Sequence, residues 1–153
     1  MRKQRIYIDT SVIGGCFDNE FKYWSNQLFN DFFVGKKIAV ISETSLEELS
    51  FAPDTVKSII KQIPDDSLEV IELSEEITQL ANDYIASGAL SVKSKEDALH
   101  IAAATISEVD VIVSWNFKHI VNLDKIRKYN SVNLNRGYRL IDIRTPMEVI
   151  SYE

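Results

Sequence analysis

The chain has little of what marks secreted or membrane proteins. It contains one cysteine, Cys16, which excludes an internal disulfide framework and a thiolate zinc cluster. No apolar run approaches the length needed to span a bilayer. The basic start at residues 1–5 leads into a β-like run, and no apolar stretch of a signal peptide follows it. We therefore expect a cytoplasmic protein without a membrane segment.

Glycine and proline are also scarce, with five and three residues that are scattered along the sequence. No stretch rich in either residue, no internal repeat and no low-complexity segment divides the chain. At 153 residues, one compact domain is the default. We expect a single domain over residues 1–153.

Positive charge is not in excess, because the formal net charge is −6. Residues 61–110 carry 3 basic and 11 acidic side chains, whereas residues 111–153 carry 7 basic and 4 acidic ones. An acidic protein binds polyanions poorly. A nucleic-acid function therefore needs cations to screen the acids and needs basic side chains to contact phosphates, for which the candidates are Lys118, Lys125, Arg127, Lys128, Arg136 and Arg139. The alternative is that these six are solvated surface charges.

Short apolar runs alternate with longer amphipathic patterns. The runs at 6–8, 38–41, 68–71, 111–113 and 140–143 are predicted strands, and the first four are short and rich in Val and Ile, as in strands buried on both faces. Helices are predicted near 22–34, 75–87 and 95–107. Ser74 marks a helix start, Gly88 a helix end, and the alanines after residue 97 suit close packing on a sheet. This alternation predicts a parallel α/β sandwich, in which ligands gather at the carboxyl ends of the strands.

Three segments place a carboxylate at the edge of an apolar element. They are Tyr7-Ile8-Asp9-Thr10-Ser11, Ser45-Leu46-Glu47-Glu48-Leu49 and Asp97-Ala98-Leu99-His100-Ile101-Ala102. A buried carboxylate is costly unless it is paired, hydrogen-bonded or bound to a metal. Three such groups at one end of a sheet make an oxygen-ligand site for Mg²⁺ or Mn²⁺, and such cations usually serve phosphate chemistry. The combination predicts a metal-dependent nuclease with Asp9, Glu48 and Asp97 as ligands.

Each acid also has an ordinary interpretation as part of a helix start. Asp9 can be the N-cap of the next helix, with Thr10 and Ser11 as hydrogen-bond donors or as further caps. Asp97 suits the dipole of a first helical turn and can close a capping box with Ser94. These alternatives stay open at the level of the sequence.

The two adjacent glutamates compete for one place in the site. Thr44 with Glu47, and Ser45 with Glu48, both match a capping box, and only one register can hold. If Thr44 caps the helix, Glu47 closes the box and Glu48 remains free to bind a metal. We therefore prefer Glu48 as the ligand, on a helix whose buried face is marked by Leu46 and Leu49.

Other polar residues lie beside the acids. His100 is one turn after Asp97 and either contacts a substrate phosphate or is a satisfied polar residue at the edge of the cleft. Asn116 follows the fourth strand, where its side-chain oxygen can bind a cation, although Asn also suits a turn. Trp115 either stacks on a base or packs in the core.

Taken together, these segments resemble the PIN-domain family, which includes the ribonuclease toxins of VapC-type toxin–antitoxin pairs. The first three motifs are the acidic segments, and a fourth is the run that begins Ser114-Trp115-Asn116-Phe117-Lys118. The end of the chain, residues 137–150, is similar to the tail of a bacterial PIN subgroup with the same Trp-Asn motif. The resemblance covers nearly the whole chain, in four motifs in order.

The resemblance implies a PIN-like three-layer sandwich with a five-stranded parallel sheet. It implies Mg²⁺- or Mn²⁺-dependent cleavage of RNA by Asp9, Glu48, Asp97 and Asn116, with Thr10, Ser11, His100 and Lys118 as substrate contacts. It also implies a homodimer and a cognate antitoxin as partners.

One residue departs from the family pattern. Many members carry an aspartate where this chain has Asn116, and the missing charge weakens the case for a second metal. The rival interpretation is a degenerate PIN domain that binds RNA or a partner protein without cutting.

Overall fold

The computed structural model describes residues 2–152 and has an all-parallel sheet of five strands. The strands are β1 (Arg5–Ile8), β2 (Ile38–Ser42), β3 (Leu68–Ile71), β4 (Val111–Val113) and β5 (Ile143–Arg144), and their order is β3-β2-β1-β4-β5. The α-helices are α1 (Thr10–Gly15), α2 (Lys22–Phe33), α3 (Glu43–Leu49), α4 (Asp54–Lys61), α5 (Glu75–Ala86), α6 (Lys95–Ile106) and α7 (Leu123–Asn135). Three 3-10 helices complete the described chain: η1 (Asp65–Ser67), η2 (Val92–Ser94) and η3 (Pro146–Glu148).

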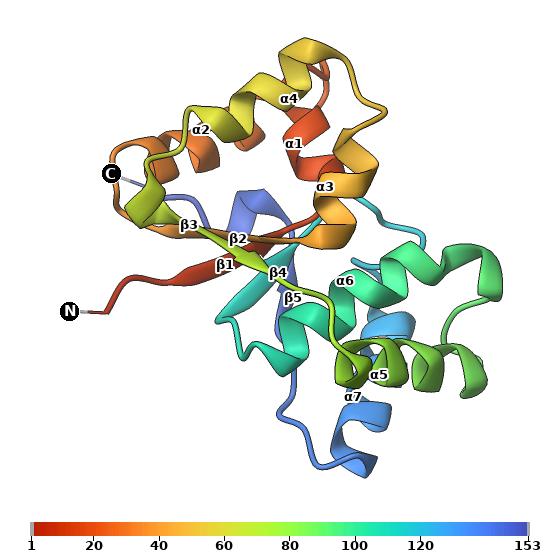
Figure 1. The fold of residues 1–153 in the computed structure, drawn as a ribbon. Helices are drawn as coiled ribbons and strands as arrows, with labels where there is room; N and C mark the ends of the chain where they lie inside the picture. Colours follow the sequence, from red (N-terminus) through yellow and green to blue (C-terminus); the bar gives the residue numbers. More distant parts are fainter. Residues whose placement is uncertain (1, 153) are drawn as a thin grey trace.

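Helices cover both faces of the sheet, as Figure 1 shows, with α1 to α4 on one side and α5 to α7 on the other. Strand residues alternate between two apolar clusters, because successive side chains of a strand point to opposite faces. Tyr7, Val40 and Ile112 belong to the cluster with α5, α6 and α7, whereas Ile6, Ile41 and Val113 belong to the other. The predicted three-layer α/β sandwich is confirmed.

Helix α6 is the most buried of the helices. Its alanines 98, 102, 103 and 104 are fully buried, and their small side chains let the helix lie close to the sheet. The predicted start and end of α5 are confirmed, since Ser74 Oγ accepts the N–H of Ile77 and Gly88 has φ +85°. This left-handed conformation is one that glycine adopts without strain.

Two details differ from the sequence prediction. The last strand is Ile143–Arg144 rather than 140–143, because the Asn130 side chain bonds both the N–H and the C=O of Ile141 and keeps that backbone from β4. The amphipathic pattern near 22–34 predicts an apolar face that includes Tyr23, but Tyr23 is 61% exposed and its ring lies perpendicular to that of Trp24.

Strand order determines where a site can form. The chain winds from β1 to β2 and β3 on one side, then crosses to β4 and β5 on the other. Ligands of open parallel sheets bind outside the carboxyl ends of the strands at such a switch point. The switch point here lies between β1 and β4, whose last residues Ile8 and Val113 are paired in register. Asp9 and Ser114 follow these two residues directly.

Candidate active site

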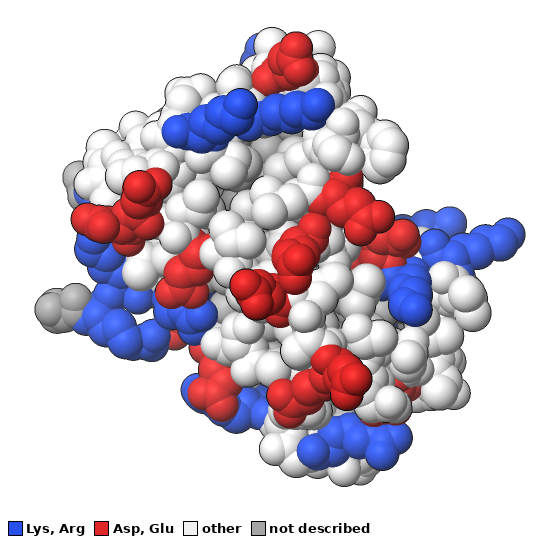
Figure 2. All heavy atoms as spheres, viewed as in Figure 1, with Lys and Arg blue, Asp and Glu red and all other residues white. Residues whose placement is uncertain are grey.

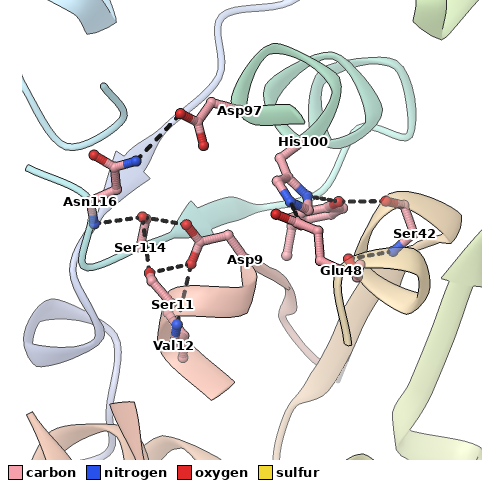
Figure 3. A network of polar contacts seen from close by, with 11 residues as sticks. Asp9, Ser11, Val12, Ser42, Glu48, Asp97, His100, Ser114 and Asn116 are labelled. Carbon is pink, nitrogen blue, oxygen red and sulfur yellow. Dashed lines mark hydrogen bonds and ion pairs between the residues drawn. The ribbon is translucent and has the colours of Figure 1, made fainter. Parts of the chain in front are cut away.

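Asp9 is the most constrained acid of the site (Figure 3). It is the N-cap of α1, and its Oδ1 accepts the N–H of Val12 at 3.3 Å and the hydroxyl of Ser11 at 2.6 Å. Its Oδ2 accepts the hydroxyl of Ser114 at 2.6 Å. Asp9 is 4% exposed, and this burial raises the pKa of its carboxyl, while the charge of His100 and the two hydroxyls act in the opposite direction. Its capping role and its place at the strand edge are therefore compatible.

The segment after β4 closes the site on one side. Ser114 Oγ accepts the N–H of Asn116, and Ser11 Oγ accepts the N–H of Trp115, both at 2.9 Å. The Asn116 Oδ1 accepts the N–H groups of Lys118 and His119 at 3.2 and 2.9 Å, so this oxygen serves the turn. The Asn116 Nδ2 lies 3.5 Å from Asp97 Oδ2, at the limit of a hydrogen bond. Asn116 thus presents a donor, rather than a metal-binding oxygen, to the acids.

Trp115 packs inside the protein. It is 6% exposed, its Nε1 donates to Ser25 Oγ at 2.9 Å, and its ring stacks on Phe21 with centroids 4.2 Å apart. This burial fits the core-packing alternative for Trp115, and stacking on a base has no support here.

Asp97 lies in the first turn of α6 and is half-buried. Burial raises the pKa of this carboxyl, and the charges of Asp9 and Glu48 raise it further, while His100 and His119 oppose the shift. Asp9 and Glu48 are therefore close enough to Asp97 for their charges to act on it. Figure 3 shows them coming from three different elements around one region.

Glu48 is held by a chain of buried polar groups. Its Oε1 contacts His100 Nε2 at 2.5 Å, the other ring nitrogen contacts the hydroxyl of Tyr7 at 2.6 Å, and this hydroxyl contacts Ser42 Oγ at 2.8 Å. His100 is 1% exposed. Burial alone lowers the pKa of His100, but the contacts with Tyr7, Glu48 and Asp9 outweigh burial and raise it. Neither ring nitrogen is available to a substrate phosphate, so the ring positions Glu48.

The start of α3 corrects the predicted capping. The N-cap is Ser42, not Thr44, and the capping box is formed by Ser42 and Ser45. Strand β2 runs directly into the helix, which moves the start two residues earlier. Thr44 is 4% exposed and its hydroxyl has no hydrogen-bond partner, while Leu46 is 46% exposed instead of buried. Glu47 therefore closes no box and is exposed, whereas Glu48 is half-buried and faces His100.

The remaining predicted contacts lie at the rim. Thr10 is the first residue of α1 and half-buried, and Lys118 is exposed. Four of the six basic candidates are already engaged: Lys125 with the Ala89 carbonyl, Lys128 with Asp124, Arg136 with Asp83 and Arg139 with Glu108. Figure 2 shows acidic side chains gathered where α3 and α6 meet, with basic ones toward the edges of this view.

The donor set suits a hard divalent cation in chemical type, because carboxylate oxygens are the ligands that Mg²⁺ and Mn²⁺ prefer. With the side chains as they stand, however, no three His, Cys, Asp or Glu among residues 2–152 could hold one ion together. Glu48 is turned toward His100, and both oxygens of Asp9 accept hydroxyls. Coordination by all three acids stays a prediction that requires a side-chain rotation or bridging water.

The structure places the predicted Asp9, Glu48, Asp97 and the polar run after β4 around one region, and their role as a site stays a prediction. The sequence prediction missed Tyr7 and Ser42, which extend the chain of contacts from His100. The signal that could have found Tyr7 is a phenol between the two isoleucines of β1, two residues before Asp9.

Among residues 2–152, none of the helices has the length and apolar character of a membrane span.

Comparison with known proteins gave matches in structure alone. No family model and no curated sequence matches the chain. A structure of VapBC2 from Rickettsia felis, bound to a DNA fragment from its promoter, aligns with a TM-score of 0.56 at 14% identity, over 93% of this chain and 98% of the other. The sarcin–ricin loop cleaving toxin VapC20 from Mycobacterium tuberculosis aligns with a TM-score of 0.56 at 11% identity, over 89% and 98%. The chain therefore has the PIN-domain fold of the VapC toxins.

Proposed function

We propose that the protein is a metal-dependent endoribonuclease that hydrolyses phosphodiester bonds of RNA, as the toxin of a toxin–antitoxin pair. The observation that carries this proposal is the cluster of Asp9, Glu48 and Asp97 at the switch point of the sheet. The charges of Asp9 and Glu48 disfavour the charged form of Asp97, and none of the ion pairs among residues 2–152 supplies Asp9 or Asp97 with a cation. A ligand of opposite charge would relieve this repulsion.

Asp9, Glu48 and Asp97 are the residues that would hold Mg²⁺ or Mn²⁺. Such a cation, when bound, makes a water more acidic and screens charge on the phosphate oxygens. The hydrolysis adds water across one P–O bond and leaves a phosphate on one fragment and a hydroxyl on the other.

The chain's own groups prepare the site in three ways. The hydroxyls of Ser11 and Ser114 fix both oxygens of Asp9, and Asn116 Nδ2 faces Asp97. His100, buried against Tyr7, fixes the direction of Glu48. Lys118 is exposed in the turn after β4 and would contact a phosphate of the RNA. Preorganised groups of this kind do not have to reorganise as the reaction proceeds.

The likeness to VapC20, a toxin that cleaves the sarcin–ricin loop, supports RNA as the substrate. The VapBC2 complex supports an antitoxin as partner.

Because a ribonuclease toxin acts where RNA is translated, we place the activity in the cytoplasm. Residues 1–153 then act as one domain, and self-association as a homodimer is part of the same proposal.

A second candidate is binding without cleavage. Two observations favour it: Asn116 supplies a donor where many PIN domains have an acid, and Glu48 is engaged by His100. Such a degenerate domain would bind RNA or a partner protein and would leave the phosphodiester intact.

The deciding experiment is cleavage of a labelled single-stranded RNA in Mg²⁺, Mn²⁺ or chelator. We expect cleavage that chelator abolishes and that Glu48→Gln removes, while Glu20→Gln, an exposed acid on the loop before α2, leaves cleavage unchanged. Cleavage in chelator equal to that in Mn²⁺ would refute the metal-dependent reaction. Folded protein that cuts nothing in either metal would favour the binding module.

A further inference from the structure

A pocket of about 400 Å³ opens between α3 and the segment that leads into α6. Its lining consists of Thr44, Glu47, Glu48, Phe51, Lys93, Ser94, Glu96 and Asp97. Glu48 and Asp97 also belong to the candidate active site, so the pocket adjoins that site directly. Its size is within the range of small-molecule sites.

Two lining residues outside the proposed cleavage site, Thr44 and Phe51, are unusual for a folded protein. The Thr44 hydroxyl is buried and has no hydrogen-bond partner, which is costly for a folded protein unless a ligand or water completes it. Phe51 lies just beyond α3 with 88% of its surface exposed, the largest exposure among the big apolar side chains of residues 2–152. A hydroxyl without a hydrogen-bond partner, on Thr44, and an exposed aromatic ring, on Phe51, line the same pocket. Together they indicate a flat ligand with polar edges.

We propose that this pocket binds a nucleobase with an exocyclic amino group, namely adenine, cytosine or guanine, next to the phosphate that is cleaved. The proposal rests on the proposed function and adds to it a preference for sequence. Phe51 stacks on the base, the carboxylates of Glu47 and Glu96 accept the amino hydrogens, and the Thr44 hydroxyl bonds a ring nitrogen or carbonyl. Stacking on an aromatic side chain and pairing of carboxylates with amino groups are general means of recognising unpaired bases.

The charge of the pocket decides which part of a nucleotide enters it. Glu47, Glu48, Glu96 and Asp97 face a single basic residue, Lys93, which is exposed at the rim. Phosphate is repelled by this lining, so it stays outside, near Lys93 or beside the cation that the active-site acids would hold. Uracil presents two carbonyl oxygens beside its one N–H, and these oxygens are repelled by the same carboxylates. The lining therefore selects bases that present an amino group.

The pocket's shared wall with the active site favours a base over a basic side chain of a partner protein. A nucleotide whose phosphate lies at Asp97 has its base attached within reach of the same helix. An arginine would satisfy the carboxylates and Phe51 but has no acceptor for the Thr44 hydroxyl, because guanidinium only donates hydrogen bonds. The hydroxyl has to donate to something, and a base offers ring nitrogens and carbonyls.

Binding of free nucleosides tests the proposal without RNA cleavage or metal. The probes are adenosine, cytidine, guanosine and uridine, titrated into the full chain in chelator and followed by NMR shifts of the Phe51 ring and Thr44 methyl group. We expect the three amino-bearing nucleosides to bind about tenfold more tightly than uridine, the size of effect that one or two polar contacts give. Phe51→Ala should weaken their binding about tenfold through loss of stacking.

Two further variants separate recognition from folding. Thr44→Val removes the hydroxyl but keeps the shape, so we expect weaker nucleoside binding with a melting temperature that stays the same or rises. Tyr152→Ala, which removes an aromatic side chain that is 68% exposed in the C-terminal segment, should leave nucleoside binding unchanged. The probes lack phosphate, so their binding does not depend on cleavage. Nucleosides bound by a protein that does not cleave RNA would refute the proposed function and would leave the inference about the pocket intact.

Three results would overturn the inference. The first is cleavage of RNA by a protein whose pocket binds no nucleoside. The second is uridine bound as tightly as the other three nucleosides. The third is tighter binding of N-acetyl-arginine amide than of any nucleoside, which would assign the pocket to a basic protein segment.

Discussion

The two edges of the sheet treat their acidic side chains differently. At the amino edge, each buried or half-buried acid has a cation: Asp110 pairs with Arg2 at 2.7 Å, Glu69 with Arg5 at 2.7 Å, and Asp31 with Lys37 at 2.8 Å. At the carboxyl edge, Asp9 and Asp97 have hydroxyl or amide neighbours and form none of the ion pairs found among residues 2–152. At the carboxyl edge Glu48 contacts His100, so within the described residues the two edges differ in whether every buried acid has a cation.

This difference shows in the pKa values. Burial acts on Asp110 too, but the backbone N–H of Arg5 and the guanidinium of Arg2 outweigh it and lower the pKa of Asp110. Burial dominates at Asp9 and Asp97 and raises their pKa values. An acid whose charge is unfavourable in the folded protein is kept at a cost in stability, and such groups gather at functional sites. This contrast fits a stabilising role for the amino edge and the binding role that we propose for the carboxyl edge.

The largest effect should come from breaking the buried ion pair at the amino edge. Lys37 and Asp31 are 8% and 4% exposed, and Asp31 Oδ2 also accepts from Ser151. Lys37→Met leaves this carboxylate buried without a cation, so the free energy of unfolding should fall by about 3–5 kcal/mol in urea denaturation. The double variant Lys37→Met with Asp31→Leu should recover most of this loss. A loss below about 1 kcal/mol in the single variant would mean that the pair is not effectively buried.

At the carboxyl edge, removal of a charge should affect RNA cleavage strongly and stability little. Asp9→Asn removes a desolvated charge, and the hydroxyls of Ser11 and Ser114 can reorient to meet the amide. The melting temperature without metal should stay equal or rise, while RNA cleavage falls by about 100-fold or more. The increase of melting temperature on addition of Mn²⁺, expected for the wild type by linkage, should disappear. Strong destabilisation of Asp9→Asn with retained cleavage would reverse the roles of the two edges.

The sequence predicted the sheet and the positions of the acids well, because both follow local patterns. Buried parallel strands are short apolar runs, and Asp9 comes directly after one of them. Helices α4 and α7 were not predicted, α4 because it is only eight residues long and α7 because most of its residues are polar or charged. The last strand was misplaced because an Asn130 side chain, distant in sequence, occupies the backbone of Ile141.

Two features of the candidate site, the N-cap of α3 and the role of His100, could not be predicted from the sequence because they depend on contacts between distant residues. Both Thr44 and Ser42 are hydroxyl residues near the start of α3, and Ser42 becomes the N-cap because β2 runs directly into the helix, where its hydroxyl also contacts Tyr7. The role of His100 depends on Tyr7 and Glu48, which lie 93 and 52 residues away. Spacing along one helix placed His100 near Asp97 but could not show that its ring faces inward.

Asn116→Asp should make the carboxyl edge still more acidic. Aspartate can accept the N–H groups of Lys118 and His119 as Asn116 does, so the turn should persist. Its second oxygen would face Asp97, where the amide donates at 3.5 Å, and we expect the metal-free protein to lose roughly 1 kcal/mol. Mn²⁺ should then raise the melting temperature more than in the wild type, and cleavage should become faster. An equal response to Mn²⁺ in the two proteins would show that position 116 does not contact the metal.

The smallest effect, and the one that isolates pH, should come from Asp110 at the amino edge. Its folded pKa is lowered, so its stabilisation is present above the unfolded pKa, near 3.9, and disappears as pH falls through the folded value. Asp110→Asn should therefore cost about 0.5–1 kcal/mol at neutral pH, and the difference from wild type should close in acid. The loss should also shrink in high salt, because Arg2 is 70% exposed, while the bond from the Arg5 N–H can persist to the Asn oxygen. Urea denaturation at neutral and acid pH, in low and high salt, measures both dependences. RNA cleavage by Asp110→Asn should equal that of the wild type. A difference in the free energy of unfolding that is the same at neutral and acid pH would show that the charge of Asp110 does not contribute to stability.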